Sequence, residues 1–341
     1  MMKKAVFILS CFFFLLIPLL SVYSETDTLF EDEFEEFVPY SDSSSVCDST
    51  CNSCDSVQTS SDGEFRLNTR LNITILALAL TILSGIFLRF APTRKLRYLV
   101  LLIALIIFGF YNGACPCPIS SLSNVFIYFA GGEAHFENML WFLGLLPITY
   151  IFGKVWCGWV CHLGSLQEFI YSHQKIKFLE GPTAQKILKY LRYILTITLI
   201  VQLFIVPEYL FKEIDPFRVA YNLGMGATTL SWILLALLLL TSVFMYRPFC
   251  RGACPIGLLI GWVAKIPGAS VLGANESCIG CNLAVKSCKI QAISPKENYN
   301  ILDNKECIAC GNCIDACSKK EMKFFRKNSL HNDKQIICKK N

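Results

Sequence analysis

The sequence is poor in charged residues. Only 17% of its 341 residues are Asp, Glu, Lys or Arg, whereas 54% are hydrophobic, and the mean hydropathy is +0.48. An ordinary soluble protein carries more charge than this, so that class is excluded. The charges are also unevenly placed, because residues 25–66 are acidic and the C-terminal region is rich in lysine. This asymmetry indicates opposite sides of a membrane and argues against nucleic-acid binding.

The scarcity of charges within the apolar segments and the scarcity of histidine each disfavour a class of function. The long apolar segments hold few internal charges apart from Arg192, so no ion pathway is visible and a transporter is disfavoured. Histidine occurs only four times in the chain. Cys157, Cys161 and His162 form C-x3-C-H, whereas covalent haem attachment uses C-x-x-C-H, so the spacing disfavours a bound haem.

Five apolar segments are expected to cross a membrane, whose hydrocarbon core of roughly 30 Å needs about 20 apolar residues in a helix. Basic residues gather in the loops after the first and third segments, which predicts that these loops face the cytoplasm. The chain would then begin outside the cytoplasm and end inside it. The expected spans are 71–88, a run that opens at 98–110, 139–152, 190–206 and 229–245.

The N-terminus is typical of a cleaved secretory signal, with Lys3 and Lys4 before an apolar run and small residues before Glu25. The polar stretch that follows has too little apolar content to fold alone. It contains Cys47, Cys51 and Cys54, whose role the sequence leaves open. The expected organisation is a signal peptide at 1–24, an acidic, disordered extracytoplasmic segment at 25–68, a transmembrane domain at 69–265, a ferredoxin-like domain at 270–325 and a basic tail at 326–341.

Cysteine, in contrast, is abundant, with 18 residues that occur in clusters. Residues 307–317 read CIACGNCIDAC, which fits the C-x2-C-x2-C-x3-C run of bacterial iron–sulfur proteins. Residues 278–288 follow the same spacing, but Ala284 occupies the third cysteine position. Zinc sites usually pair two CxxC motifs across a longer gap, and disulfides need an oxidising compartment. The two runs therefore favour iron–sulfur binding in the cytoplasm.

In two-cluster ferredoxins the fourth cysteine of each run binds the other cluster. This rule gives one complete ligand set for a [4Fe–4S] cluster and one set that lacks a cysteine. The incomplete set could hold a [3Fe–4S] cluster, a [4Fe–4S] cluster with another ligand, or no cluster. The complete set is Cys288, Cys307, Cys310 and Cys313, and the incomplete set is Cys278, Cys281 and Cys317.

Three further cysteine pairs follow the apolar segments. WCGWVCHLG holds Cys157 and Cys161, and FCRGACPIG holds Cys250 and Cys254, so both share C-x3-C-x2-G. In a helical turn, C-x3-C puts both sulfurs on one face. The two pairs together could bind a further cluster, could form thiol–disulfide pairs, or could simply be small residues that pack closely at helix ends. The remaining pair, Cys115 and Cys117 in GACPCPI, has no assigned role.

In combination, these motifs resemble the membrane-bound 4Fe–4S polyferredoxins of the NapH/NosR type over roughly residues 70–325. The resemblance implies electron transfer between the quinone pool or a cytoplasmic donor and a periplasmic reductase system in the bacterial inner membrane. It also implies that the four C-x3-C cysteines are the paired motif cysteines of the family. By the same resemblance, the seven cysteines of the two C-terminal runs would be cluster ligands.

The sequence departs from this family pattern at several points. His162 replaces the proline after the first C-x3-C, Ala284 replaces a ligand, and Lys289 and Ser318 replace the prolines that usually follow the two runs. The short acidic segment has no counterpart of the flavin-carrying domain of NosR-type proteins, which favours the NapH-like architecture.

We therefore expect a mainly α-helical polytopic membrane protein with about five transmembrane helices and a C-terminal α+β two-cluster ferredoxin-like domain. The expected partners are the membrane, a quinone or quinol, and redox partner subunits, with no nucleic acid. The pattern points to an electron carrier subunit more than to a stand-alone enzyme. The alternative function is a redox-sensing or iron-sensing protein, or one that helps to mature a metalloenzyme.

Overall fold

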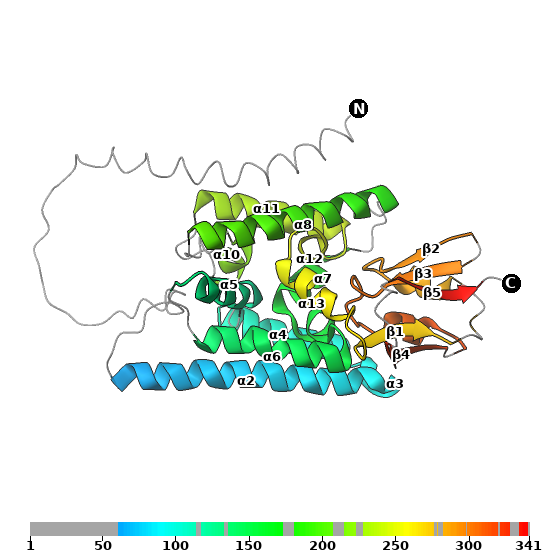
Figure 1. The fold of residues 1–341 in the computed structure, drawn as a ribbon, viewed down its shortest axis with the longest axis horizontal. Coiled ribbons are helices and arrows are strands. Elements are labelled where there is room, and N and C mark those ends of the chain that lie inside the picture. The colour runs from blue at the N-terminus through cyan, green and yellow to red at the C-terminus, as the bar shows by residue number, and fades with distance from the viewer. Residues whose placement is uncertain are drawn as a thin grey trace, which may run out of the picture. The chain divides into compact units, whose positions relative to one another are not determined.

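The computed structural model places a group of helices before a smaller region of short strands (Figure 1). The expected signal peptide, most of the acidic segment, Cys47, Cys51, Cys54, Cys115 and Cys281 lie outside the described residues. The structure describes residues 61–113, 117–132, 136–172, 181–206, 215–222, 228–275, 278, 282–297, 299–319, 321–327 and 334–339.

The predicted apolar segments all form helices, and several of these helices begin before the predicted segment. These helices are α2 (Ser61–Arg89), α4 (Arg97–Ala104) with its π-helical continuation η4 (Leu105–Tyr111), α6 (Phe136–Phe152), α8 (Pro182–Ile205) and α11 (Thr229–Phe244). The shorter helices between them are α3 (Ala91–Arg94), α5 (Pro118–Phe129), η5 (Trp156–Val160), α7 (His162–Ile170), α10 (Pro216–Tyr221), α12 (Pro248–Gly252) and α13 (Pro255–Val263).

Two of these helices are long and apolar enough to cross a membrane, over Leu71–Arg89 and Thr183–Ile205. Three shorter apolar helices cover Arg97–Tyr111, Met139–Phe152 and Thr229–Phe244. These are the five segments that the sequence predicts. The number of helices that cross the membrane, and their orientation, stay predictions.

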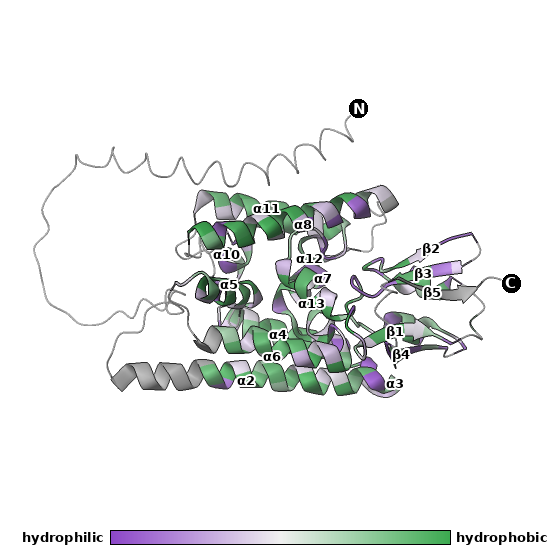
Figure 2. Cartoon of the chain, viewed as in Figure 1, coloured by the Kyte–Doolittle hydropathy of each residue, from purple (hydrophilic) through white to green (hydrophobic). Residues whose placement is uncertain are grey.

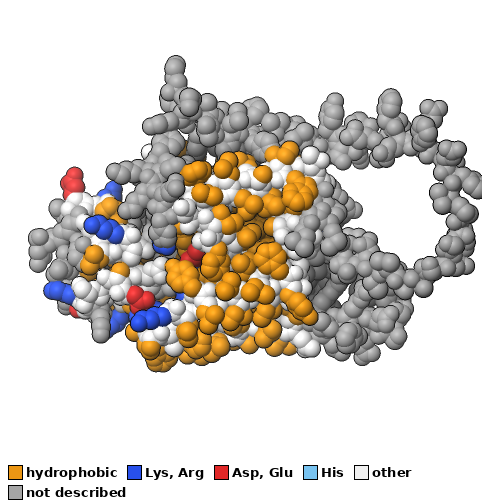
Figure 3. Space-filling view, turned by 180° about the vertical axis from the view of Figure 1, so that it is seen from behind, with side chains coloured by type: hydrophobic (Ala, Val, Ile, Leu, Met, Phe, Trp, Pro, Cys, Tyr) orange, Lys and Arg blue, Asp and Glu red, His pale blue; other side chains and the backbone are white. Residues whose placement is uncertain are grey.

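The helices expose an extensive apolar surface (Figures 2 and 3). Ile75 on α2, Ile106 on η4, Phe204 on α8 and Leu240 on α11 are each more than half exposed. Apolar patches of this extent are rare on monomeric soluble proteins and mark surfaces that contact lipid or another protein. Together with the apolar composition, this surface identifies a membrane protein.

The interior of the helical part is built around three buried tryptophans. Trp141 on α6 meets Trp156 edge to face, with the ring centroids 4.7 Å apart, and Trp159 is also fully buried. Aromatic side chains of this size contribute most to the apolar area that a core buries. The same core includes Ala309 from the second cysteine run and packs against Phe324. The helices and the cysteine-rich loops are thus joined by shared packing.

The C-terminal part is an α+β arrangement of two small antiparallel sheets. β1 (Ser270–Ala274) pairs with β4 (Met322–Arg326), and β3 (Tyr299–Asp303) lies between β2 (Ile293–Pro295) and β5 (Lys334–Lys339). One five-residue helix lies within each cysteine run. These helices are α14 (Leu283–Ser287) and α15 (Asn312–Ala316).

Strand β5 falls within the stretch that the sequence analysis expects to be a basic tail. It pairs with β3 from Tyr299↔Lys339 to Asp303↔Lys334, with an irregularity at Tyr299/Asn300. Part of the stretch predicted to be a basic tail is therefore paired with β3 in a sheet.

Candidate iron–sulfur sites

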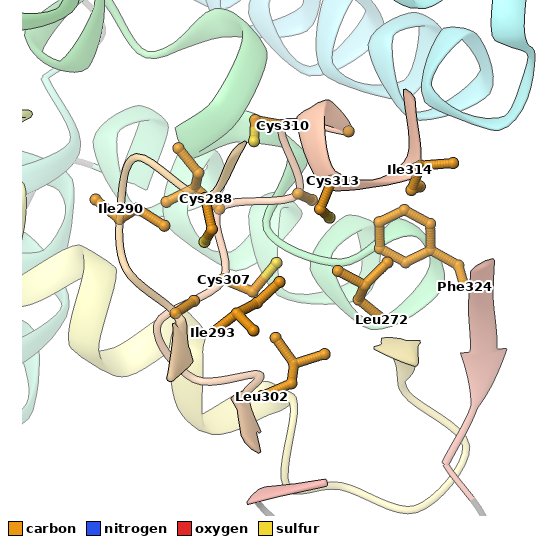
Figure 4. A pocket seen from close by; sticks show the side chains of 14 residues that line it. Leu272, Cys288, Ile290, Ile293, Leu302, Cys307, Cys310, Cys313, Ile314 and Phe324 are labelled. Atoms are coloured by element: carbon orange, nitrogen blue, oxygen red, sulfur yellow. The ribbon is translucent and has the colours of Figure 1, made fainter. Parts of the chain in front are cut away.

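Four cysteines from both C-terminal runs line one pocket, which we call the ferredoxin-type pocket (Figure 4). Its cysteines are Cys288, Cys307, Cys310 and Cys313. This is the complete ligand set expected from the sequence, and the structure brings all four residues together. The rest of the wall is apolar and includes Leu272, Ile290, Ile293, Leu302, Ile314 and Phe324.

The loops of the cysteine motifs use backbone conformations that ordinary residues seldom adopt. Among the described residues, the non-glycine residues with positive φ are Arg247, Asn282, Gln291 and Ala309, and each is close in sequence to a cysteine of a motif. Such conformations cost about 1–3 kcal/mol each and cluster at functional sites. The chain therefore accepts local strain where it positions cysteines.

Backbone N–H groups also face the thiols of the pocket. The Cys288 sulfur accepts hydrogen bonds from the backbone of Ile293 and Ala292, and the Cys307 sulfur accepts one from Ala309. Burial raises the pKa of the Cys288 thiol to about 12. Reactive redox thiols occupy exposed, electropositive places that lower their pKa, so Cys288 does not fit that class.

The two C-x3-C motifs line a second pocket, which we call the membrane thiol pocket, with Cys157, Cys161, Cys250 and Cys254. The two cysteines of each motif lie on either side of a helix boundary. Cys161 and Cys254 are the N-caps of α7 and α13, and the N–H of Gly257 donates to the Cys254 sulfur at 3.5 Å. A helix N-terminus favours negative charge, as on a thiolate bound to metal.

Cationic side chains surround the membrane thiol pocket. Its lining includes Lys154, Arg192, Arg247 and Arg251, and one acid, Glu306. Arg192 is 3% exposed, binds Glu306 at 2.6 Å and donates to the Cys250 carbonyl oxygen at 3.2 Å. Each of the four cations is less than 9% exposed. Because water screens buried charges poorly, these cations favour an anionic occupant.

A buried ion triad supports the first motif from behind. The Arg97 guanidinium binds both oxygens of Glu168, at 2.9 and 2.7 Å, and Arg247 Nε donates to Glu168 at 3.1 Å. Arg97 also donates to the Gly158 carbonyl oxygen at 2.9 Å, and Arg247 donates to that of Cys157. Burial alone raises the pKa of Glu168, but Arg247 and Arg97 lower it to about 2. The triad thus fixes the backbone that carries Cys157.

The two pockets adjoin each other, because Ile290 and Ile308 line both of them. A Cβ atom at Gly158 would overlap the carbonyl oxygen of Ile308 and lie 3.3 Å from the Cys310 nitrogen. Trp159 Nε1 donates to the Ala309 carbonyl oxygen at 3.1 Å. The first C-x3-C motif and the second C-terminal run are therefore in direct backbone contact.

The incomplete set is only partly described. Cys278 and buried Cys317 pack on the second core together with Ala284, and Cys281 lies outside the described residues. Within the described part of the chain, no three Cys, His, Asp or Glu side chains are arranged to hold a single metal ion. The ligand assignments for this set stay predictions.

Two other predicted features have defined places. His162 is fully buried against the Tyr221 ring, with centroids 5.5 Å apart, and burial lowers its pKa to about 3, so it is neutral at pH 7. Pro118, which follows Cys117, lines the membrane thiol pocket, whereas Cys117 packs against the helical core. Pro118 therefore helps to enclose the pocket that the other two motifs build.

Comparison with known proteins identifies the family. A family model described as a 4Fe–4S binding domain matches residues 134–178 and 228–271, which contain the two C-x3-C motifs. An uncharacterized protein of Methanocaldococcus jannaschii is 30% identical over 66% of this chain and 93% of its own length. The ferredoxin-type protein NapH of Haemophilus influenzae is 26% identical over 63% of this chain and 79% of its own length. The chain belongs to the NapH/NosR-like family of membrane ferredoxins.

Membership in the NapH/NosR-like family makes this an iron–sulfur protein of electron transport. The regulatory protein NosR of Pseudomonas aeruginosa is 26% identical over 64% of this chain, but the match covers only 32% of NosR. No solved structure matches the chain. The family match falls on the membrane thiol pocket, for which the sequence alone leaves a cluster, a dithiol pair and simple packing open.

The cations of the membrane thiol pocket were missed by the sequence reasoning, although a signal for two of them exists. Lys154 stands three residues before Cys157 in KVWC, and Arg247 stands three residues before Cys250 in RPFC. The repeat is therefore longer than C-x3-C-x2-G. A basic residue stands three positions before the first cysteine, and an aromatic residue stands directly before it. Arg97 and Glu168 carry no comparable repeat, because they meet only through the fold.

Proposed function

We propose that the protein is a membrane-anchored iron–sulfur electron carrier that passes electrons between a cytoplasmic donor or the quinone pool and a partner reductase system. In this proposal, each of the two four-cysteine pockets holds a [4Fe–4S] cluster. The ferredoxin-like domain faces the cytoplasm, and the acidic N-terminal segment lies on the other side of the membrane.

The observation that carries the proposal is the shared wall between the pockets. Ile290 and Ile308 line both, and the absence of a side chain at Gly158 lets the two cysteine loops meet. Adjacent sites of this kind suit electron transfer between them, whereas two separate structural clusters would not need a common wall. Apolar residues at the wall also keep water away from both sets of thiols.

The residues present fit the cofactor. Each pocket supplies four cysteine sulfurs, the usual ligand set of a [4Fe–4S] cluster. When bound, such a cluster supplies reversible one-electron chemistry. The chain contributes the rest: N–H groups that donate to sulfur at Cys254, Cys288 and Cys307, and the triad that holds the backbone at Cys157.

The incomplete set remains a separate part of the proposal. Cys278, Cys281 and Cys317 would hold a [3Fe–4S] cluster, a [4Fe–4S] cluster with a non-cysteine ligand, or no cluster. Ala284 is buried in the second core, so it fills its position as a packing residue.

The test is an iron and sulfide count on protein purified without oxygen, with electron paramagnetic resonance spectra as isolated and reduced. Two filled pockets give about eight irons, and a filled incomplete set raises the total to about eleven or twelve. Cys250→Ser and Cys313→Ser should each remove about four irons and a different spectral signal. Cys338→Ser, on strand β5, is the control and should remove none.

Two results would contradict the proposal. If Cys250→Ser leaves the iron content unchanged, the membrane thiol pocket holds no cluster and the electron relay is wrong. If reduced protein fails to reoxidise reversibly although its iron is complete, the sensing or maturation function becomes the better interpretation.

A further inference from the structure

The two pockets differ sharply in charge, although their cysteines are equal in number. In the described residues, the ferredoxin-type pocket is lined by cysteines, glycine, alanine, leucine, isoleucine and phenylalanine, and no charged side chain is among them. The membrane thiol pocket is lined by four cationic side chains and one carboxylate. The balance of charge at its wall is therefore positive.

The positive charges act on the membrane thiols at short range. Arg192 interacts electrostatically with Cys157, Cys250 and Cys254, and Arg247 interacts with Cys157 and Cys250. At the ferredoxin-type pocket, Arg97 interacts with Cys310 from outside the lining. Lys154 and Asp303, which are of opposite sign, both act on Cys307.

Backbone dipoles add to the contrast. Helices α7 and α13, with nine residues each, begin directly after Cys161 and Cys254. Their positive N-terminal ends therefore face the membrane thiol pocket. Among the described helices, five-residue α15 contributes Cys313 and Ile314 to the ferredoxin-type pocket, and five-residue α14 ends directly before Cys288.

These charges bear on reduction. A cluster held by four thiolates is anionic, and reduction adds one further negative charge. Nearby cations stabilise that added charge, and the net charge and hydrogen bonds around a cluster are among the main factors that set its reduction potential. Because Arg192 and Arg247 are buried, water weakens their effect less than it would at the surface.

We infer that the membrane thiol pocket has the higher reduction potential of the two, so that electrons enter at the ferredoxin-type pocket and collect at the membrane thiol pocket. This inference rests on the proposed function, and it adds a direction to it. One electron leaves the first site as one arrives at the second, and no bond is made or broken. The donor that this direction requires is a low-potential one-electron reductant on the side of the ferredoxin-like domain.

The first experiment is a redox titration of the whole purified protein, followed by electron paramagnetic resonance. Cys250→Ser and Cys313→Ser identify which signal belongs to which pocket, because each removes one. We expect the signal that is lost in Cys250→Ser to appear at the higher potential. Equal potentials, or the reverse order, would overturn the direction while leaving the proposed clusters intact.

Three variants at two positions of helix α8 test whether charge is the cause. Arg192→Gln removes a cation of the pocket wall. It should lower the equilibrium constant for reduction of the membrane thiol pocket about tenfold, which lowers the reduction potential by about 59 mV. Lys189→Gln is the matched control, because Lys189 pairs with the same Glu306 at 3.4 Å from the same helix but does not line the pocket. It should produce a clearly smaller shift, and Arg192→Lys should largely restore the potential.

The possible failures are distinguishable. If Arg192→Gln and Lys189→Gln change the potential equally, the pocket cations do not set it and the electrostatic argument is wrong. If the wild-type protein shows no signal that Cys250→Ser removes, the proposed function itself fails. If Arg192→Gln does not fold, the order of the wild-type potentials still decides the direction.

Discussion

At the scale of single residues, the contact between the two sites depends on one glycine. Gly158 lies in η5 between Trp156 and Trp159, where any side chain would meet the Ile308 carbonyl oxygen. The obstruction is backbone, which cannot turn aside as a flexible side chain could. The space at this position, rather than the chemistry of glycine, is what brings the cysteine loops together.

Gly158→Ala should therefore separate the loops and reduce stability by about 1–3 kcal/mol, as overpacking of a tight site does. We expect a lower melting temperature and slower electron transfer from the ferredoxin-type pocket to the membrane thiol pocket, measured by rapid mixing with a reductant. Gly144→Ala on α6 is the control, because a Cβ there would meet the flexible Leu78 side chain and not backbone. Equal effects of the two variants would show that the contact at Ile308 has no special role.

Glu168 is the second decisive residue, because it balances two buried guanidiniums at once. Glu168→Gln leaves Arg97 and Arg247 without their common carboxylate, and breaking a buried ion pair in this way costs about 3–5 kcal/mol. The wild-type protein should also lose stability in acid. The folded pKa of about 2 lies below the ordinary value of 4.5, so the contribution is complete above pH 4.5 and is lost as the pH falls toward 2.

Thermal unfolding in detergent at several pH values measures both effects. The wild-type protein should lose stability between pH 4.5 and 2, and the part of that loss due to this carboxylate should be missing in Glu168→Gln. Identical pH profiles for the two proteins would mean that Glu168 does not carry the acid sensitivity. An unchanged melting temperature at pH 7 would contradict the role of the triad.

At the scale of elements, the sequence predicts the helices and the cysteine sets far better than their contacts. Apolar runs identify α2, α6, α8 and α11, because a long uncharged segment has few alternatives to a helix in lipid. Local spacing likewise predicts which cysteines share the ferredoxin-type pocket. The structure adds that each C-x3-C motif spans a helix boundary, which a helical-turn interpretation of the spacing does not anticipate.

Other elements could not be predicted, for physical reasons. Strand β5 is lysine-rich, and its pairing with β3 depends on cross-strand contacts rather than on its own composition. The cations of the membrane thiol pocket are single charges in apolar surroundings, and their partners lie as far as 151 residues away in sequence, as for Lys154 and the Lys305 carbonyl oxygen. Long-range packing of this kind leaves no local sequence pattern. Only the two basic residues that precede the C-x3-C motifs, Lys154 and Arg247, could have been predicted from the sequence.

At the scale of the whole molecule, both pockets lie near the same ends of the two longest apolar helices. Arg94, just beyond the C-terminal end of α2, binds Asp315 of α15 at 2.7 Å, and Arg192 in the N-terminal half of α8 lines the membrane thiol pocket. The 19 residues of Leu71–Arg89 rise about 28 Å from one end to the other. The opposite ends of these helices are therefore far from every described cysteine pocket.

This arrangement predicts that the described sites serve one membrane face and the adjoining part of the bilayer. In liposomes that present the ferredoxin-like domain outward, an impermeant reductant should reduce both sites quickly. An impermeant oxidant trapped inside should stay oxidised until a lipid-soluble quinone is added, because the remaining distance is too long without a carrier. Cleavage of the ferredoxin-like domain by a protease added outside the liposomes confirms that this domain faces outward, and it is the control. Rapid reduction of the trapped oxidant without quinone would mean that the chain itself carries electrons across, by a route beyond the two pockets.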